Sequence, residues 1–118
     1  MSDKQKDQLQ LDQSRLVDAW RRVLPTTMKT TDAVTVKADE ANPKALRVAV
    51  GNAGHSLYTF DFLVTYVDSR EVKVELVDAE KGEGGTIDER SSLVQDLIQD
   101  HVRNLHECAQ ALQQETHA

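Results

Sequence analysis

The stretch LYTFDFLVTYVDSREVKVELV, residues 57–77, decides the fold. Apolar side chains recur at every second position on both sides of Asp68-Ser69-Arg70. A period of two is typical of β-strands with one covered face, because successive side chains point to opposite faces of a sheet. The stretch therefore predicts two strands, over residues 57–67 and 71–77, joined as an antiparallel hairpin.

The length of the link sets how these two strands pair. A two-residue turn would place the aromatic face of the first strand against Lys73 and Glu75 of the second. A three-residue loop at residues 68–70 places apolar side chains beside one another. Since a slip of one residue exchanges the faces of a strand, burial favours this loop. The predicted neighbours are Tyr66, Val64 and Phe62 on one strand and Val72, Val74 and Leu76 on the other.

Two further strands are predicted before the hairpin. Residues 33–38 form a weaker strand, residues 46–50 alternate clearly, and residues 39–44 between them contain the turn formers Asp, Asn and Pro. The glycines within residues 51–54 suit a hairpin connection. The strand over residues 57–67 is apolar on both faces, which indicates a central strand or an interface. Its second face carries Leu57, Leu63 and Val67.

An apolar period near 3.6 predicts one helix on each side of the strands. The first covers residues 9–24 and ends before Pro25, because a proline disfavours helical geometry in the residue that precedes it. The second covers residues 88–113, has a capping box that starts at Thr86, and follows a glycine-rich connection at 79–86. Its apolar side consists of Leu93, Val94, Leu97, Ile98, Val102, Leu105, Ala109 and Leu112.

These elements predict an α+β fold with an N-terminal helix, an antiparallel meander of three to four strands and a long C-terminal amphipathic helix packed on the sheet. We expect a single domain over residues 9–113, with disordered ends at 1–8 and 114–118. A helix over residues 88–113 would be about 39 Å long, whereas a strand of seven residues spans about 23 Å. Part of the helix is therefore expected to overhang the sheet.

Composition limits the classes of function. The chain has 118 residues and a formal net charge of −6, with a pI near 5.1. This charge argues against binding to nucleic acid and to anionic membranes. The first eight residues are polar, no segment reaches the ~20 apolar residues of a membrane span, and Cys108 is the single cysteine. We expect a soluble cytoplasmic protein, most simply bacterial or viral.

His101, His106 and Cys108 are the strongest candidates for a metal or redox site. On a helix, His101 and Cys108 lie two turns or about 10 Å apart, and His106 points to a different side. Zinc requires its ligand atoms about 2 Å from the ion, so this spacing favours structural roles. A cysteine near the C-terminus of a helix also lacks the positive dipole that activates thiolates. We predict no metal and no cofactor.

Two other features of the sequence are candidate sites. The glycines of residues 82–86 precede a helix, but they lack the lysine and the spacing of a phosphate-binding loop. Asp61 lies among aromatic residues, and we expect it at a solvated part of the second sheet face near Thr59, because an unpaired buried charge is costly. No catalytic set emerges, which favours a protein that is not an enzyme.

The leading hypothesis is a non-enzymatic interaction or regulatory protein that acts as a homodimer, with a larger protein partner also considered. The two-sided strand and the overhanging helix support it, because another chain would cover both surfaces. In the competing monomer, the N-terminal helix seals the second sheet face. The expected interface residues are Leu57, Leu63, Val67, Leu105, Ala109 and Leu112.

Two alternatives come from other classes of protein. One is a small-molecule-binding domain or enzyme that uses the aromatic sheet face as a pocket wall. The residues expected to face such a ligand are Tyr58, Phe60, Phe62 and Tyr66. The other is a metal or redox sensor built from the helix histidines and the cysteine.

Overall fold

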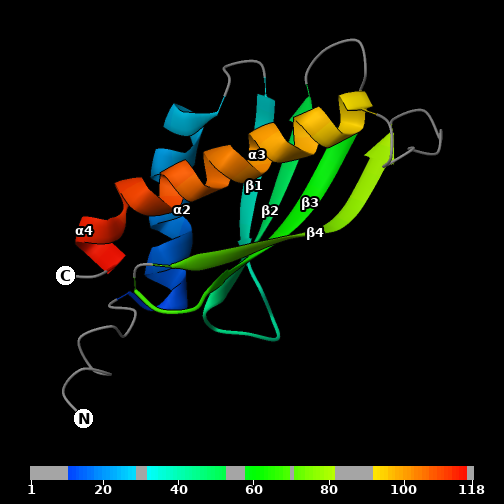
Figure 1. Ribbon diagram of the computed structural model, residues 1–118. Helices are drawn as coiled ribbons and strands as arrows, with labels where there is room; N and C mark the ends of the chain where they lie inside the picture. Colours follow the sequence, from blue (N-terminus) through cyan, green and yellow to red (C-terminus); the bar gives the residue numbers. More distant parts are fainter. Residues whose placement is uncertain (1–10, 29–31, 53–57, 70, 82–91, 117–118) are drawn as a thin grey trace.

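The computed structural model describes residues 11–28, 32–52, 58–69, 71–81 and 92–116 of the chain (Figure 1). It confirms the α+β fold, with an N-terminal helix, a four-stranded antiparallel sheet and a C-terminal helix packed on the sheet. The elements are α2 (Gln13–Thr27), β1 (Asp32–Ala38), β2 (Ala45–Asn52), β3 (Tyr58–Tyr66), β4 (Val72–Lys81), α3 (Ser92–Ala111) and α4 (Gln113–Thr116).

The four strands form a meander in the order β1-β2-β3-β4, so β1 and β4 are the two edges of the sheet. Both long helices cover the same face. On α2, Trp20 donates a hydrogen bond from its indole Nε1 to the Tyr66 hydroxyl, 3.0 Å away. On α3, the His101 ring packs against Phe60 and Phe62. Phe60, Phe62 and Tyr66 are separated by even numbers of residues along β3, so their side chains point to the same face of the sheet. Both helices therefore pack on that face, and Figure 1 shows α3 crossing in front of the strands.

The predicted register of the β3–β4 hairpin is confirmed. Tyr66 pairs with Val72, Val64 with Val74, and Phe62 with Leu76. The loop at residues 68–70 closes with the Val67 N–H donating to the Glu71 carbonyl at 2.9 Å. The hairpin therefore has the three-residue loop, which brings the apolar side chains of β3 and β4 together on one face.

β4 is longer than the predicted strand over residues 71–77, since it continues to Lys81. Leu76 pairs with Phe62 and Asp78 pairs with Asp61, so Val77 is an extra residue on β4. Such a β-bulge shifts the alternation by one residue. It returns Ala79 to the helix-covered face opposite Phe60, which explains how residues that read as a connection still extend the sheet.

The prediction that Pro25 ends the first helix is wrong, because α2 continues to Thr27. Pro25 lies in the last turn, where its missing N–H removes only one bond near the helix end. The hydroxyls of Thr26 and Thr27 donate to the carbonyls of Val23 and Leu24 and support this turn. At the other end, the Asp12 side chain accepts a hydrogen bond from the Arg15 N–H at 2.9 Å and caps the helix.

The core lies between the helices and the sheet. β3 shows the alternation that its sequence predicts, with every second side chain buried from Phe60 to Tyr66. The largest fully buried side chains are Trp20, Phe60, Phe62, Leu16, Leu24, Leu46, Leu105, Leu112, Val48, Val50, Val64 and Val94. The predicted strand neighbours Val74 and Leu76, and Ile98 from the predicted apolar side of the helix, are partly buried and pack against this core.

The C-terminal helix does not leave its apolar stripe uncovered. Leu105, Ala109 and Leu112, which we expected only another chain to cover, are buried within the single chain. α2 packs against this part of α3, and the Thr27 hydroxyl donates to the Asn104 carbonyl at 3.1 Å. The overhang predicted from length is therefore covered by the N-terminal helix.

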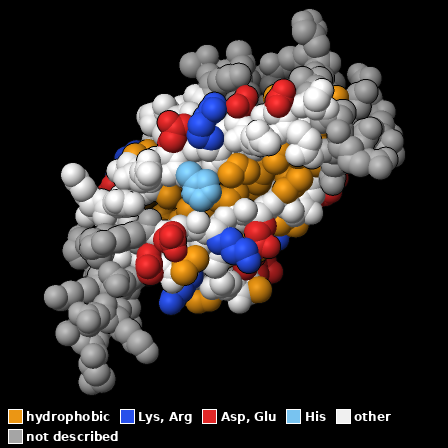
Figure 2. All heavy atoms as spheres, in the orientation of Figure 1, with side chains coloured by type: hydrophobic (Ala, Val, Ile, Leu, Met, Phe, Trp, Pro, Cys, Tyr) orange, Lys and Arg blue, Asp and Glu red, His pale blue; other side chains and the backbone are white. Residues whose placement is uncertain are grey.

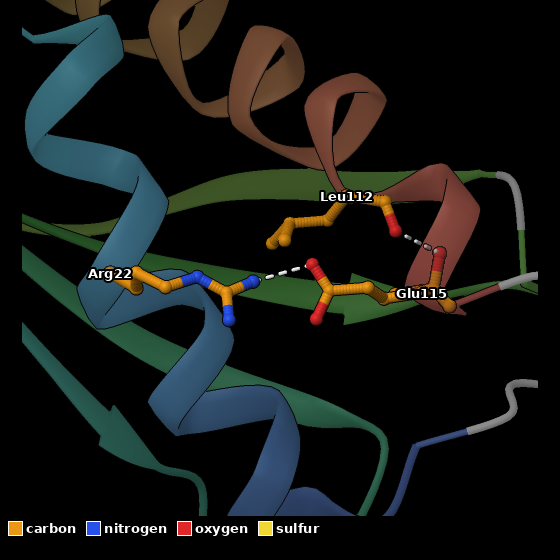
Figure 3. A network of polar contacts seen from close by, with 4 residues as sticks. Arg22, Leu112 and Glu115 are labelled. Carbon is orange, nitrogen blue, oxygen red and sulfur yellow. Dashed lines mark hydrogen bonds and ion pairs between the residues drawn. The ribbon is translucent and has the colours of Figure 1, made fainter.

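α4 continues the helical structure beyond residue 113, the predicted end of the domain, to Thr116. Thr116 is fully buried, and its hydroxyl donates to the Ser69 carbonyl at 2.8 Å. Figure 3 shows Arg22 of α2 reaching across to Glu115 of α4, next to the Leu112 carbonyl that accepts a second bond from the Thr116 hydroxyl. These contacts tie the C-terminal turn to α2 and to the β3–β4 loop.

Several predictions fall on residues that the structure does not describe. They are the disordered start at residues 1–8, the helix start at Leu9, the glycine link at residues 53–54, the interface residue Leu57, the glycines of residues 82–86 and the capping box at Thr86. Among the described helices, none is both long and apolar enough to cross a membrane.

Candidate interaction surface

The aromatic residues proposed as a pocket wall form the core instead. Phe60 and Phe62 are fully buried, and Tyr66 is 3% exposed. Tyr58 is half-buried and stacks on Phe60, with ring centroids 6.1 Å apart. The face that carries these rings is occupied by α2 and α3, so the aromatic residues hold the helices on the sheet.

The three residues considered for a metal site separate as the helical spacing predicts. His101 and Cys108 are buried under the helix, whereas His106 is exposed. Burial raises the pKa of the Cys108 thiol to about 12, which keeps it protonated and unreactive at neutral pH. Within the described ranges, no group of three or more His, Cys, Asp or Glu residues is placed to hold a metal ion.

Within the described residues no helix lies on the second face of the sheet, because α2 and α3 both pack on the face of Phe60, Phe62 and Tyr66. This arrangement contradicts the monomer in which the N-terminal helix covers the second face. Its apolar residues differ in exposure: Leu63 is half-buried, Val67 is 60% exposed and Val77 is 47% exposed. Charged side chains alternate with them, as is typical of an antiparallel sheet with one solvated face. The charged residues on this face include Lys37, Arg47, Asp61, Lys73 and Glu75.

A hollow of about 540 Å³ lies on this open face, beside the β1–β2 loop. Asp61, which pairs with Ala49 of β2, reaches the hollow from β3. The cations Lys37 and Arg47 and the acidic side chains of the loop also line it. The hollow therefore carries both signs of charge, and Asp61 lies half-buried at a solvated position, as its sequence context predicts.

An apolar surface remains on the helix-covered side, between α3 and the outermost strand. We call it the α3–β4 band, and its members are half-buried side chains that pack against the core from outside. They are Val74, Leu76 and Ala79 on β4 and Leu97, Ile98 and Val102 on α3. Figure 2 shows hydrophobic side chains gathered across the middle of this face, with acidic and basic side chains on both sides.

One end of the band opens into a hollow of about 500 Å³. β4 contributes Val72 and Lys73, and Glu71 lies just before the strand, while α3 contributes His106 and Gln110 from the other side. The hollow therefore separates the start of β4 from the second half of α3, and it continues the apolar band along the edge of the sheet.

The backbone of β4 is directed by the hairpin. The Glu71 carbonyl accepts from the Val67 N–H, so the backbone groups of Glu71 face β3. Backbone groups alternate sides along a strand, so Lys73 and Glu75 also face β3. The N–H and C=O groups of Val72, Val74 and Leu76 then point to the outer edge, where no strand of the described chain pairs with them.

The opposite edge is treated differently. The Arg21 side chain of α2 donates from Nε to the Val36 carbonyl of β1 at 3.0 Å. Next to it, the Gln13 side-chain amide donates to the carbonyls of Asp39, Asn42 and Ala45 at 2.8–3.0 Å. α2 thus supplies hydrogen-bond donors to the β1 side of the sheet.

Comparison of this chain with known protein families, with curated proteins and with solved structures finds no match. The sequence placed the exposed Val67 and the half-buried Leu63 on the open face, but it missed the α3–β4 band. The alternation of residues 71–77 carried that signal, because a strand at the end of a meander has one unpaired edge.

Proposed function

We propose that this chain is a non-enzymatic interaction or regulatory protein that acts as a homodimer. The observation that carries the proposal is the α3–β4 band, an apolar surface that lies directly beside a strand edge with which no described strand pairs. Proteins usually protect such edges with charges, bulges or a covering element, because free N–H and C=O groups attract other strands. The bulge of β4 lies at Val77, after the regular part of the edge. The charged side chains of the regular part, Lys73 and Glu75, are of opposite sign.

Two features of this surface favour association with a second chain: its half-buried apolar side chains and the outward-facing backbone groups of β4. Half-buried apolar side chains gain free energy when a partner removes them from water, at about 25 cal/mol per Å². Backbone groups at the edge gain specific hydrogen bonds from a partner strand. A second copy supplies both with the same patch on each subunit, which is the usual form of a two-fold dimer.

We place the protein in the cytoplasm. Support comes from its single cysteine, which is a free and buried thiol in the fold, as in proteins of reducing compartments. Fractionation of cells that express the untagged chain tests this location, with recovery in the cytosolic fraction expected and recovery in a membrane or secreted fraction contradicting it.

The test of the proposed function is analytical ultracentrifugation at micromolar concentrations. We expect a species of twice the chain mass of 13.2 kDa. Val102→Glu places a charge in the band and should yield monomers with unchanged helix content. Ala111→Glu is the matched control, because Ala111 is exposed on the opposite side of α3 and receives the same charge.

The outcomes separate the surfaces. A parent chain that sediments as a monomer at the highest soluble concentration contradicts the homodimer. A dimer that survives Val102→Glu but dissociates on Val67→Asp would move the interface to the open sheet face, which also carries the expected Leu63. Dissociation by both Glu variants alike would point to net charge rather than to the band.

A further inference from the structure

The charges along the outer strand are arranged so that the strand matches a second copy of itself in one register. Residues 71–77 read Glu-Val-Lys-Val-Glu-Leu-Val. Lys73 and Glu75 lie on the open face on either side of Val74, and their side chains are 66% and 48% exposed. They interact weakly within one chain, with Nζ and Oε1 3.7 Å apart. Both charges therefore remain available to a partner strand.

The antiparallel registers of two β4 strands differ in which charges they bring together. A two-fold axis at Lys73 would oppose that residue to its own copy, and an axis at Glu75 would do the same for the carboxylate. An axis at Val74 places Lys73 opposite Glu75 of the partner subunit, and the reverse pair forms by symmetry. Opposite charges that face each other across strands are stabilising and like charges are destabilising, so the pattern selects the axis at Val74.

The backbone is compatible with this register. Val72, Val74 and Leu76 are the residues whose N–H and C=O groups point to the free edge, as the hairpin closure requires. With the axis at Val74, that residue meets its own copy, and Val72 meets Leu76 of the partner subunit. All outward-facing residues then meet other outward-facing residues, which is the condition for hydrogen-bonded pairs in an antiparallel ladder.

The apolar band is also continuous across such a junction. A two-fold axis perpendicular to the sheet keeps the helices of both copies on the same face. Val74, a member of the α3–β4 band, then lies beside its own copy, and Leu76, another member, lies beside Val72 of the partner subunit. The bulge at Val77 ends the regular edge and limits how far the strands can slide past each other.

We propose that two chains join by antiparallel pairing of β4 with β4, with the two-fold axis at Val74, so that two four-stranded sheets form one continuous sheet of both subunits. This pairing rests on the homodimer proposed above and gives it a defined geometry. The β1 edge is not the pairing edge in this proposal, because Arg21 already donates a hydrogen bond to the Val36 carbonyl there.

The test uses charge reversal at the two selecting residues. Lys73→Glu and Glu75→Lys each turn two attractive contacts in the dimer into repulsive ones, and each should raise the dimer dissociation constant about tenfold or more, judged by cross-strand pair energies. An equimolar mixture of the two variants should form heterodimers with the parent affinity. The double variant should also dimerise like the parent.

Matched controls remove the effect of net charge. Lys37→Glu and Glu40→Lys give the same two net charges, but they lie at the β1 side of the sheet, where both residues are exposed. These controls should self-associate like the parent, and mixing them should change nothing. All measurements use sedimentation equilibrium at low salt, because screening weakens exposed charge pairs.

The results distinguish this pairing from the proposed function on which it rests. If the parent dimerises and neither reversal changes its dissociation constant, the β4 pairing is wrong and the homodimer stands. If both single variants dissociate but the mixture fails to restore dimers, the register at Val74 is wrong. If the parent chain is monomeric, both proposals fall.

Discussion

The two edge strands of the sheet, β1 and β4, differ in the contacts that their outward-facing backbone groups make. β1 is a strand of seven residues that lies beside α2, whose Arg21 side chain donates to the outward-facing Val36 carbonyl. β4 has ten residues, and the outer backbone groups of its first half face no strand of the described chain. Beside β4, the apolar side chains under α3 are only half-buried.

The difference teaches where a second chain can attach. An edge at which a side chain already donates to an outward-facing carbonyl, as Arg21 does to Val36, gains fewer hydrogen bonds from a new strand. An open edge beside an apolar surface gains both hydrogen bonds and burial. The difference between the two edges also limits the size of the assembly. When two copies pair through their β4 edges, only their β1 edges remain at the ends of the joined sheet, and Arg21 already contacts each of these. The arrangement thus favours a closed dimer over an open fibre.

The largest expected effect on stability comes from removing Trp20, the residue that anchors α2 on the sheet. Trp20 is fully buried and donates to the Tyr66 hydroxyl. Trp20→Ala should lower the free energy of unfolding by about 3–5 kcal/mol, because it leaves a large cavity. Urea denaturation followed by circular dichroism measures the loss. A decrease below about 1 kcal/mol would show that α2 is not anchored through this residue.

Alkaline pH should lower the free energy of unfolding, because Tyr66 and Cys108 are buried in the core. Burial raises the pKa of Tyr66 to about 12 from 10.0, against the lowering effect of the Trp20 hydrogen bond, and burial raises the pKa of Cys108 to about 12 from 9.0. The unfolded chain therefore releases protons that the folded chain keeps, so stability falls as pH rises above about 9, by up to about 1.4 kcal/mol per pH unit for each group.

Denaturant midpoints between pH 7 and pH 12 test this linkage. Cys108→Ala should remove the part of the decline that begins near pH 9, and Tyr66→Phe the part that begins near pH 10, when each variant is compared with its own midpoint at pH 7. Midpoints that stay constant up to pH 11 in the parent chain would show that neither group is buried as described.

A smaller effect is expected from opening the guarded edge. Arg21→Met keeps the apolar stem but removes the donor to the Val36 carbonyl, and it should cost about 1 kcal/mol of stability. With both edges free, larger assemblies than dimers should form at high concentration. Light scattering against concentration follows this change. Scattering identical to that of the parent would mean that Arg21 does not guard the edge.

The smallest expected effect concerns the ion pair between Arg22 and Glu115 in Figure 3. Its side chains are 61% and 43% exposed, so a double-mutant cycle with Arg22→Ala and Glu115→Ala should give a coupling energy of about 0.2–1 kcal/mol that declines with salt. A coupling above about 2 kcal/mol would indicate that the C-terminal turn contributes more to the guarded side than its exposure suggests.

Local patterns predicted much of the fold. The β3–β4 register follows from residues 57–77 alone, because only one loop length buries both apolar faces together. The burial of His101 and Cys108 beside the apolar stripe also follows from helical spacing. These features depend on neighbours in sequence, where the period of the pattern and the length of a loop leave few choices.

Features that depend on distant contacts were not predictable in this way. The turn at Pro25 survives because buried Leu24 and the threonine hydroxyls hold it. The bulge at Val77 appears only when β4 is aligned with β3. The cover over Leu105 and Leu112 comes from the opposite end of the chain, so helix length alone suggested an overhang that α2 fills.

The most direct test of the free β4 edge is amide hydrogen exchange, residue by residue, above and below the concentration at which dimers dissociate. The N–H groups of Lys73 and Glu75 face β3 and serve as internal controls that should stay protected at both concentrations. The N–H groups of Val72, Val74 and Leu76 should be protected in the dimer and exchange rapidly after dilution. Rapid exchange at Val74 in a sample that sediments as a dimer would contradict the pairing of β4 with β4.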